Sequence, residues 1–436
     1  MENGLRVGIA GLGTVGASVV RVMHDKSAQM SAQCGRKVSV TSATARDRTK
    51  DRGVDLSGIN WADSPQALAV SDDIDVFVEL IGGDEGPARE AVEAALDAGK
   101  HVVTANKALL AKHGVALAQK AEASGVILNF EAAVAGGIPI IKTMRESLSG
   151  NSVERVYGIM NGTANYILTR MEKDKISFND CLADAQRLGY AEADPTFDIE
   201  GHDTAHKLAI LTSLAFGTQI AADEIYMEGI SNISLDDIEA ARELGYRIKL
   251  LGVAQKTDTG IEQRVHPTMV PLGSVIAQVE SVTNAVAVEA DIAGSLLMSG
   301  PGAGGDATAS AVVGDIADIA KSKPGHQQAP ALGNPADDLK PYIRARMRAH
   351  SGGYFIRLVV HDKPGVFAAI ASRMADNDIS LESIVQRGDH AADAPKTVIL
   401  ITHKTTESAI REAIGAIENG GHLVSKPQVI RIEKAA

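Results

Sequence analysis

The chain has 436 residues, of which 45% are apolar and 22% charged, and its net charge is −12. This length predicts about two to four domains, and the acidic balance argues against sequence-independent binding of nucleic acid, which needs clustered cations. No apolar run approaches the roughly 18 residues of a membrane span. The first expected strand starts near Leu5, which leaves no room for a signal peptide, and two cysteines exclude a disulfide framework. We therefore expect a cytoplasmic protein.

The first region, residues 1–137, is expected to be a doubly wound parallel α/β domain of the Rossmann type. Short apolar strands alternate with helices over 14–24 and 85–98, and the strands fall at 5–10, 37–45, 74–80, 101–104 and 126–130. This alternation is typical of βαβ units. A later helix, 307–320, follows a glycine-rich stretch, and we expect it to return to this domain.

The rest of the chain predicts two further domains and a linker. Residues 138–299 combine a strand at 153–160 with helices such as 203–216, and we expect an α+β catalytic, substrate and dimerisation domain. Residues 321–350 are rich in proline and predict a linker. Residues 351–436 follow a β-α-β-β-α-β order, which is ferredoxin-like, with elements at 354–360, 366–376, 379–386, 397–403, 407–418 and 428–432.

The run Gly11-Leu12-Gly13-Thr14-Val15-Gly16 ends the first strand and opens the first helix. Gly11 permits a tight turn, Gly13 allows the backbone to approach a pyrophosphate, and Gly16 allows close packing of helix and strand. The free N–H groups of the helix start would bind the anion. The run predicts a dinucleotide site, and the alternative is a glycine-rich turn without a ligand.

The end of the second strand bears on which dinucleotide binds. Arg46, Arg48 and Lys50 could pair with a 2′-phosphate, whereas Asp47 could bind a 2′-hydroxyl group. A solvated charged loop is the plain alternative. We expect NADP as the cofactor, with NAD usable.

Two lysines are candidates for chemistry. Lys107 follows the carboxyl end of a strand, where ligands collect in open α/β sheets, although an exposed loop lysine is the alternative. Asp203 and Lys207 are four residues apart on one helix face, and the apolar run Leu208–Leu211 indicates that this helix is buried. Burial lowers the pKa of a lysine, as a proton-transfer group requires. The alternative is a surface ion pair worth about 0.3–0.5 kcal/mol.

Three stretches of the chain, Glu131–Pro139, Gly158–Leu168 and Gly189–Lys207, resemble the motifs of homoserine dehydrogenase. The resemblance implies reversible NAD(P)H-dependent reduction of L-aspartate 4-semialdehyde to L-homoserine in threonine, methionine and isoleucine biosynthesis, by a homo-oligomer (a dimer or a tetramer). It also implies that Lys207 is the acid/base, that Lys107 polarises the substrate oxygen, and that Asp198 and Asp203 orient the substrate and the lysine.

The same resemblance implies the binding residues. Glu192 would hold the substrate ammonium group, and the substrate-binding set would be Glu192, Asp198, Asp203, Gly162 and Thr163. The cofactor-binding set would be Gly11, Leu12, Gly13, Thr14, Val15, Gly16, Arg46, Ile81, Lys107 and Gly302. A late motif, Pro301–Ser310, also matches, although Ala307 stands where many members have proline.

The family also has a monovalent cation, usually sodium. The matching positions are Glu131, Val134, Gly136 and Ile138, which would act mostly through backbone carbonyl groups. Glu131 could equally be a hinge residue with no ion.

The C-terminal region resembles an ACT domain, a small amino-acid sensor. The stretch His361–Phe367 matches the turn of that domain, in which Gly365 can expose N–H groups to a carboxylate. The resemblance implies feedback inhibition by L-threonine, at a site that includes Asp362, Gly365, Val366 and Gln386. A domain that only dimerises is the alternative. We expect truncation after about residue 345 to keep catalysis and to remove threonine sensitivity.

Two other functions are weighed against this one. A catalytically inactive, dinucleotide-binding amino-acid sensor would share the glycine run but would not need Lys107, Glu192 and Lys207. Aspartate-semialdehyde dehydrogenase chemistry would need a nucleophilic cysteine. Cys34 is expected in a polar connection after the first helix and Cys181 on an amphipathic helix, so neither is poised for that role.

Overall fold

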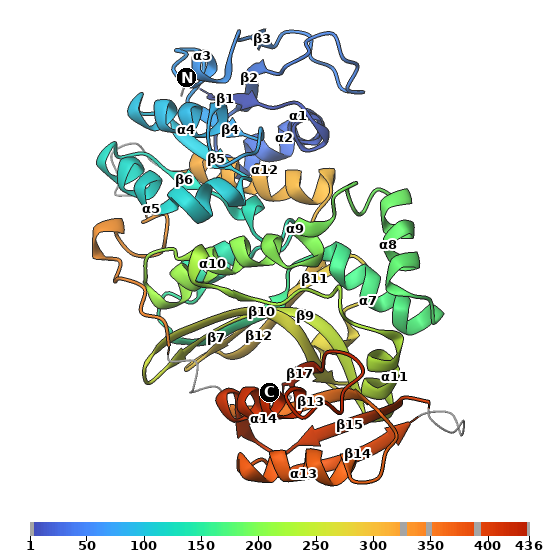
Figure 1. Ribbon diagram of the computed structural model, residues 1–436. Helices are drawn as coiled ribbons and strands as arrows, with labels where there is room; N and C mark the ends of the chain where they lie inside the picture. Colours follow the sequence, from blue (N-terminus) through green and yellow to red (C-terminus); the bar gives the residue numbers. More distant parts are fainter. Residues whose placement is uncertain (1–3, 323–328, 346–350, 388–393, 434–436) are drawn as a thin grey trace.

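A computed structural model of the chain describes residues 4–322, 329–345, 351–387 and 394–433. The N-terminal domain is at the top of Figure 1, the middle domain below it, and the C-terminal domain at the bottom. Across these described ranges, no helix combines the length and the apolar character that crossing a membrane requires.

The N-terminal domain contains a six-stranded parallel sheet in the order β3-β2-β1-β4-β5-β6. Its strands are β1 (Leu5–Ala10), β2 (Val38–Thr44), β3 (Asn60–Trp61), β4 (Val76–Glu79), β5 (His101–Thr104) and β6 (Leu128–Asn129). The expected doubly wound sheet is confirmed. The strand order reverses between β1 and β4, and ligands bind at such a switch point beyond the carboxyl ends of the strands.

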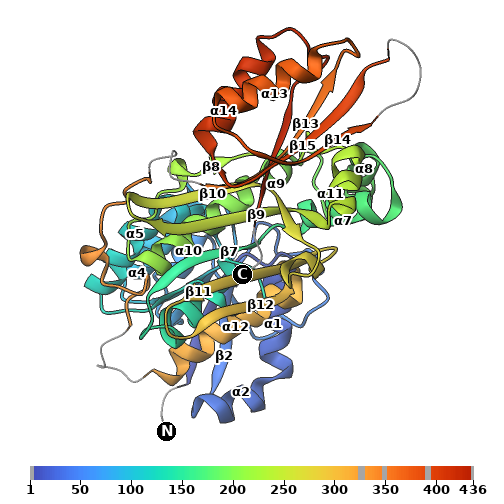
Figure 2. The same ribbon diagram turned by 90° about the horizontal axis from the view of Figure 1, so that it is seen from below.

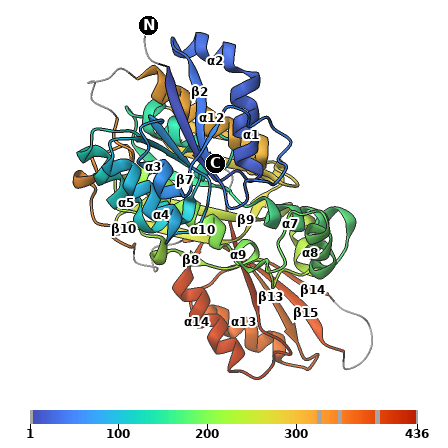
Figure 3. The ribbon, with the colours of Figure 1, turned by 90° about the horizontal axis from the view of Figure 1, so that it is seen from above.

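Helices cover both faces of this sheet: α1 (Thr14–Asp25), α2 (Ser27–Cys34), α3 (Pro65–Ala69), α4 (Pro87–Asp97), α5 (Lys107–Ala123) and, from late in the chain, α12 (Gly305–Lys321). Figure 3 shows α12 beside α1, and Val312 and Ile316 of α12 share an apolar cluster with Val19 of α1. Cys34 does not lie in a polar connection as expected, because it ends α2 and is buried.

The middle domain contributes β7 (Val153–Ile159), β8 (Tyr226–Met227), β9 (Tyr246–Thr257), β10 (Gly260–Pro271), β11 (Thr283–Ala290) and β12 (Gly294–Pro301) to a second sheet. Its helices are α6 (Ile140–Lys142), α7 (Gly162–Asp174), α8 (Phe178–Arg187), α9 (Thr196–Ile199), α10 (His202–Phe216) and α11 (Leu235–Glu243). Leu208 of α10 packs on Gly252 of β9, so α10 covers the face of the sheet that is turned toward the N-terminal domain.

The C-terminal domain has the six predicted elements in order: β13 (Ser351–Val360), α13 (Val366–Asp376), β14 (Leu381–Arg387), β15 (Lys396–Thr402), α14 (Glu407–Glu418) and β17 (Gln428–Ile432). A two-residue strand that was not predicted, β16 (Thr405–Thr406), lies between β15 and α14. The domain is not an isolated module. Strand β17 pairs in parallel with β10, at Thr268 with Arg431 and Met269 with Ile432. The second sheet therefore runs through both domains, as the views from two sides show (Figures 1 and 2).

The segment expected to be a linker is packed where it is described. In 329–345, Leu332 and Leu339 are buried, Lys340 bridges to Thr218, and Arg344 bridges to Ile261. This segment therefore lies along the middle domain, because its apolar side chains and two backbone bridges hold it there.

Candidate active site

A cavity of about 660 Å³ lies where the N-terminal domain meets the middle domain. Its walls come from the start of α1, the start of α5, the loop before α7, the α9–α10 region and the connection from β12 to α12. The lining residues include Val15, Lys107, Gly136, Asn161, Gly162, Thr163, Tyr190, Asp198, Asp203, Lys207, Val282, Asn284, Gly302 and Thr308.

The glycine run has the geometry expected of a dinucleotide-binding turn. Gly11 has φ +101°, and a Cβ there would lie 2.4 Å from the carbonyl oxygen of Leu80. A Cβ on Gly16 would lie 2.0 Å from the carbonyl oxygen of Gly11, whereas one on Gly13 would meet nothing within 4 Å. Gly11 and Gly16 are therefore needed for packing, and Gly13 leaves open space where a pyrophosphate can approach.

Two lysines from different domains meet at one buried carboxylate. Lys207 Nζ donates a hydrogen bond to Asp203 Oδ2 at 2.7 Å and another to the carbonyl oxygen of Met160 at 2.6 Å. Lys107 Nζ, at the start of α5, is 3.0 Å from Asp203 Oδ1. Asp203 is only 5% exposed and Lys207 8%, so this is not the surface ion pair of the alternative interpretation.

The electrostatics of the cluster suit proton transfer. Burial lowers the pKa of Lys207, and the Asp203 carboxylate opposes that shift. Burial also acts against the charge of Asp203, but Lys207 and Lys107 outweigh it and hold the pKa of Asp203 below its usual range. Burial raises the pKa of Asp198, against the hydrogen bond from Asn161. An amine whose pKa is lowered, beside an ionised carboxylate, can both give and take a proton.

Asn161 joins the two carboxylates, a role that was not predicted from its place in the sequence. Its Nδ2 donates to Asp198 Oδ1 at 2.8 Å and to Asp203 Oδ2 at 2.9 Å, while its Oδ1 accepts the N–H of Ala164 at 2.8 Å. Asn161 is thus the N-cap of α7 as well as the link between the acids. An asparagine placed just before a predicted helix was the available signal.

Comparison with known proteins identifies the family. Family models described as "Homoserine dehydrogenase", "Homoserine dehydrogenase, NAD binding domain" and "ACT domain" match residues 139–317, 11–131 and 354–419. The homoserine dehydrogenase of Neisseria gonorrhoeae is 44% identical over 433 residues, which is 98% of each chain. The chain belongs to the homoserine dehydrogenase family.

Solved structures agree with this assignment. The crystal structure of a homoserine dehydrogenase from Thiobacillus denitrificans has a TM-score of 0.93 at 44% identity and covers 99% of each chain. A hyperthermophilic archaeal homoserine dehydrogenase in complex with NADPH has a TM-score of 0.64 at 27% identity, covering 75% of this chain and 100% of that one. The protein is therefore an oxidoreductase of amino-acid biosynthesis that interconverts L-homoserine and L-aspartate 4-semialdehyde, and it carries an ACT regulatory domain.

Not every residue that the homoserine dehydrogenase resemblance implied lies in the cavity. Glu192 is exposed and is absent from the cavity lining. Asp198, six residues later in the chain, is part of that lining. Ile81 follows β4 and donates its N–H to Glu79 Oε1 at 2.7 Å, away from the lining. Gly162 and Thr163 do line it, and Thr163 Oγ1 donates to the carbonyl oxygen of Tyr190 at 2.6 Å.

A second hollow, of about 390 Å³, lies beside the glycine run of this homoserine dehydrogenase. It is lined by Gly13 and Thr14 and by three cationic side chains, Arg21, Lys50 and Arg52. Arg46 is exposed and does not line it, and Arg48 turns away to pair with Asp63 Oδ1 at 2.7 Å. Arg46, Arg48 and Lys50 were predicted to pair with a 2′-phosphate, and of these three only Lys50 lines this hollow.

The residues implied for a monovalent cation form a tight turn after β6. Both carboxylate oxygens of Glu131 accept backbone N–H groups, from Ile141 at 2.8 Å and Lys142 at 2.9 Å. Ala135 and Gly136 have φ values of 57° and 55°, which places both residues in the left-handed region. Each carboxylate oxygen of Glu131 thus already has one backbone hydrogen-bond partner. The carbonyl groups of Val134, Gly136 and Ile138 remain the other implied ligands, and the ion stays a prediction.

The ACT turn has the backbone form that a carboxylate site needs. Gly365 has φ +92° and is the N-cap of α13, while the N–H of Val366 donates to the carbonyl oxygen of Lys363. Asp362 lies 3.9 Å from Lys396, and Gln386 is exposed on β14. The turn thus leaves part of the helix start open, and threonine binding there stays a prediction.

Proposed function

We propose that Lys207 is the proton donor and acceptor at the substrate oxygen and that Lys107 stabilises the negative charge that develops there. The support is geometric: both ammonium groups converge on Asp203, at 2.7 and 3.0 Å, in the cavity beside the dinucleotide turn. An alkoxide that forms from a carbonyl needs a cation or a proton donor. Nicotinamide supplies or accepts the hydride when the cofactor is bound, and these lysines serve the oxygen.

The observation that carries the proposal is the buried Lys207–Asp203 pair. The test is Lys207→Ala, with Lys207→Arg as the variant that keeps the charge but not the lowered pKa. We expect Lys207→Ala to lose at least about a hundredfold in kcat, while NADPH binding, followed by fluorescence, stays within a factor of about two. Residual activity above a few per cent would reject the assignment.

For the substrate ammonium group we assign Asp198 ahead of Glu192. Asp198 lines the cavity and accepts a hydrogen bond from Asn161, whereas Glu192 would have to move inward with its loop. A zwitterionic substrate needs a carboxylate near its amine, and Asp198 shares the cavity lining with both lysines, whereas Asp203 is already paired with them. Asp198→Asn should therefore raise the KM for homoserine more than it lowers kcat.

We also propose that NADP is the preferred cofactor. Arg21, Lys50 and Arg52 surround the hollow beside Gly13, and the archaeal relative was solved with NADPH. Arg52 is engaged by the carbonyl oxygen of Leu12 at 2.9 Å, so Lys50 is the cation with most freedom to reach a 2′-phosphate. Charge-assisted hydrogen bonds of this kind contribute about 1.5–3 kcal/mol each.

The finer regulatory function is feedback inhibition by L-threonine at the turn around Gly365, in a homo-oligomer. The support is the ACT domain match and the open helix start at that turn. Homoserine oxidation with and without millimolar L-threonine tests it. Suppression that Asp362→Ala relieves would support the assignment, and activity indifferent to threonine would leave the ACT domain with assembly alone.

A further inference from the structure

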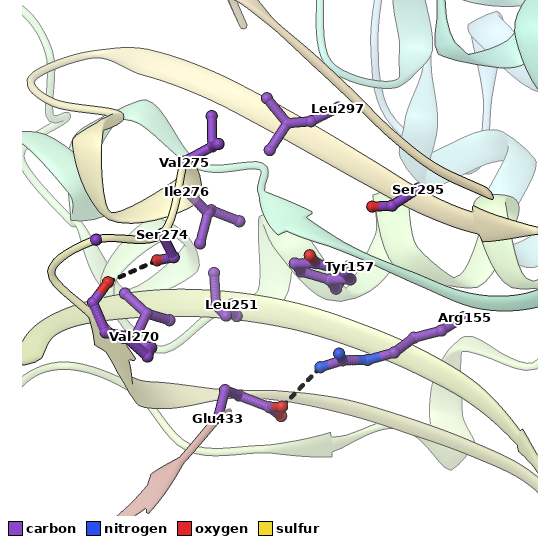
Figure 4. A pocket seen from close by; sticks show the side chains of 12 residues that line it. Arg155, Tyr157, Leu251, Val270, Ser274, Val275, Ile276, Ser295, Leu297 and Glu433 are labelled. Atoms are coloured by element: carbon purple, nitrogen blue, oxygen red, sulfur yellow. Dashed lines mark hydrogen bonds and ion pairs between the residues drawn. The ribbon is translucent and has the colours of Figure 1, made fainter. Parts of the chain in front are cut away.

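A separate cavity, of about 290 Å³, lies on the face of the second sheet that is turned away from α10 (Figure 4). Gly252 faces α10, where a Cβ would contact Thr204 and Leu208. Side chains alternate along a strand, so Leu251 faces the opposite side, where it lines this cavity. No part of the active site described above reaches it.

One half of the cavity is apolar. Leu251 of β9, Val270 of β10 and Leu297 of β12 come from three strands, and Ile276 covers them from the turn after β10 (Figure 4). Leu251, Val270 and Ile276 are buried. Together they offer an aliphatic surface to a ligand.

The other half is polar and carries both signs of charge. Arg155 of β7 donates to Glu433 Oε2 at 2.8 Å, and its Nη1 is 3.4 Å from Glu289 Oε1. The Arg155 guanidinium also lies 4.3 Å from the centre of the Tyr157 ring. Burial and Glu289 raise the pKa of Tyr157, so its hydroxyl keeps its proton. Arg155, Tyr157 and Glu433 thus stand together at one end of the cavity (Figure 4).

Two hydroxyl groups at this end are available to a ligand. Among the described residues, no hydrogen bond is made by the hydroxyl groups of Tyr157 and Ser295, both of which line the cavity. Ser274, in contrast, donates to the carbonyl oxygen of Pro271 at 2.7 Å. Available donors beside a guanidinium suit a carboxylate, and the partly buried Glu433 carboxylate suits an ammonium group.

The size and charges narrow the class of ligand. A volume of about 290 Å³ is at the small end of ligand pockets, which span about 300–1,000 Å³, and excludes a nucleotide. Arg155 is opposed by two carboxylates, Glu289 and Glu433, so a phosphate or a dianion would be repelled. A ligand with one charge would contact only one member of the Arg155–Glu433 pair favourably, whereas a zwitterion offers an opposite charge to each.

We propose that this cavity binds a small aliphatic α-amino acid, distinct from any ligand of the Gly365 turn. Its carboxylate contacts Arg155 and the Tyr157 hydroxyl, and its ammonium group contacts Glu433. Its side chain lies on the apolar half formed by Leu251, Val270, Ile276 and Leu297.

The position of the cavity would connect such a ligand to two domains. Glu433 directly follows β17 of the C-terminal domain, and its N–H donates to the carbonyl oxygen of Met269 at 2.9 Å. Arg155 is on β7, whose end leads into Met160 and Asn161 of the active site. A ligand between Arg155 and Glu433 would therefore touch the end of the regulatory domain and the strand that supports the active site.

The test is calorimetric titration of the full-length protein with L-leucine, which measures binding without turnover. We expect saturable binding with one site per chain. The same titrations with 4-methylpentanoate, which lacks the ammonium group, and with isoamylamine, which lacks the carboxylate, should be at least about tenfold weaker, since each loses a charged hydrogen bond. L-Threonine should also be weaker, because its hydroxyl would face the apolar half.

Two variants locate the site, and two more serve as controls. Ser295→Phe fills the cavity from an exposed position and should abolish leucine binding, and Tyr157→Phe should weaken it about tenfold. Ser299→Phe, on the same strand but outside the lining, is the matched control and should bind as the parent does. Asp362→Ala, in the ACT turn, should also bind normally.

Several results would overturn the proposal. No heat of binding at millimolar leucine in the parent protein would do so, as would equal binding by Ser295→Phe and Ser299→Phe. Light scattering provides a further check on the oligomer. If Ser295→Phe, but not Ser299→Phe, changed the oligomeric state, the cavity would belong to a contact between copies of the chain.

Discussion

The role of Asp203 can be tested by Asp203→Asn, which keeps the size of the side chain and removes its charge. Asp203 accepts hydrogen bonds from Lys207 at 2.7 Å and Asn161 at 2.9 Å, and Lys107 is 3.0 Å away. An asparagine cannot accept from all of these groups, and it offers no charge to either lysine. The substitution therefore perturbs the pKa of Lys207 and the placement of both ammonium groups.

The size of the effect follows from the distances. Two unit charges about 4 Å apart at an effective dielectric constant of about 20 interact by roughly 4 kcal/mol, and one pKa unit corresponds to about 1.4 kcal/mol. Loss of the carboxylate should thus lower the pKa of Lys207 by at most about three units, adding to the lowering that burial already causes. Homoserine oxidation needs neutral Lys207 to accept the hydroxyl proton. The rise of activity with pH should therefore move to lower pH, while the plateau falls at least about tenfold because the lysines lose their anchor.

The assay is the pH profile of kcat and kcat/KM for homoserine oxidation between about pH 6 and pH 10. The control is Asp236→Asn, which changes an exposed acid in the first turn of α11 and should leave the profile unchanged. Thermal unfolding of each variant separates loss of fold from loss of chemistry. A lower plateau with the rising limb in its original place would refute the idea that Asp203 sets the pKa of Lys207.

Three further predictions concern the cofactor, the buried amine of β9 and the C-terminal domain. Lys50→Ala should raise the KM for NADPH about tenfold or more and leave that for NADH nearly unchanged, which steady-state kinetics would show. Burial lowers the pKa of Lys249 to about 7, below the roughly 10.4 of a lysine in the unfolded chain. Between these two pKa values the unfolded chain binds one more proton than the folded chain, so the free energy of unfolding rises with pH by up to about 1.4 kcal/mol per pH unit. Lys249→Met should lose this pH dependence, which urea unfolding at several pH values would show. Truncation after residue 345 removes Arg357, which pairs with the buried Asp237 at 2.6 Å. Because breaking a buried ion pair costs about 3–5 kcal/mol, calorimetry should show a lower melting temperature for the truncated enzyme. A truncated enzyme as stable as the full chain would mean that the C-terminal domain is an independent module.

The parts of the fold that the sequence predicted well are those with local signals. Apolar runs bounded by glycine marked the strands of the N-terminal sheet, and the glycine run marked the turn after β1 because its spacing is set by the turn itself. The buried helix α10 was predictable because an acid and a lysine four residues apart preceded an apolar run. Each of these depends on neighbours within about one helix turn or one strand.

The hairpin of β9 and β10 escaped prediction because its strands contain buried polar residues. Lys249 is buried through hydrogen bonds to Asn165 Oδ1 at 2.9 Å and to the carbonyl oxygen of Val279. Arg264, on β10, is 3.5 Å from Glu407 of the C-terminal domain. These partners are distant in the sequence, so a polar residue that tertiary contacts satisfy looks, in sequence, like an interruption of a strand.

In the candidate site, too, the residues with local sequence signals were predicted, and those that depend on tertiary packing were not. Lys107, Asp203 and Lys207 were predicted from position and spacing, and the structure brings them together. Which nearby acid faces the cavity could not be predicted, since Glu192 and Asp198 lie in one acidic stretch and only the packing of α9 distinguishes them. A short loop can turn either acid inward without a change in composition.

The continuous second sheet also bears on how an ACT domain could act on this active site. Arg431 of β17 is 2.8 Å from Glu407 and 3.2 Å from Glu228, so one buried guanidinium holds the C-terminal domain to the segment after β8. In that segment, the N–H of Ile230 donates to the carbonyl oxygen of Ile199 at 2.9 Å, and Ile199 directly follows Asp198. A regulatory ligand changes catalysis only if it binds two states of the enzyme unequally. Because β17 pairs with β10 of the middle domain and Arg431 reaches Glu228, a shift of the C-terminal sheet would act on the segment that bonds to the backbone beside Asp198.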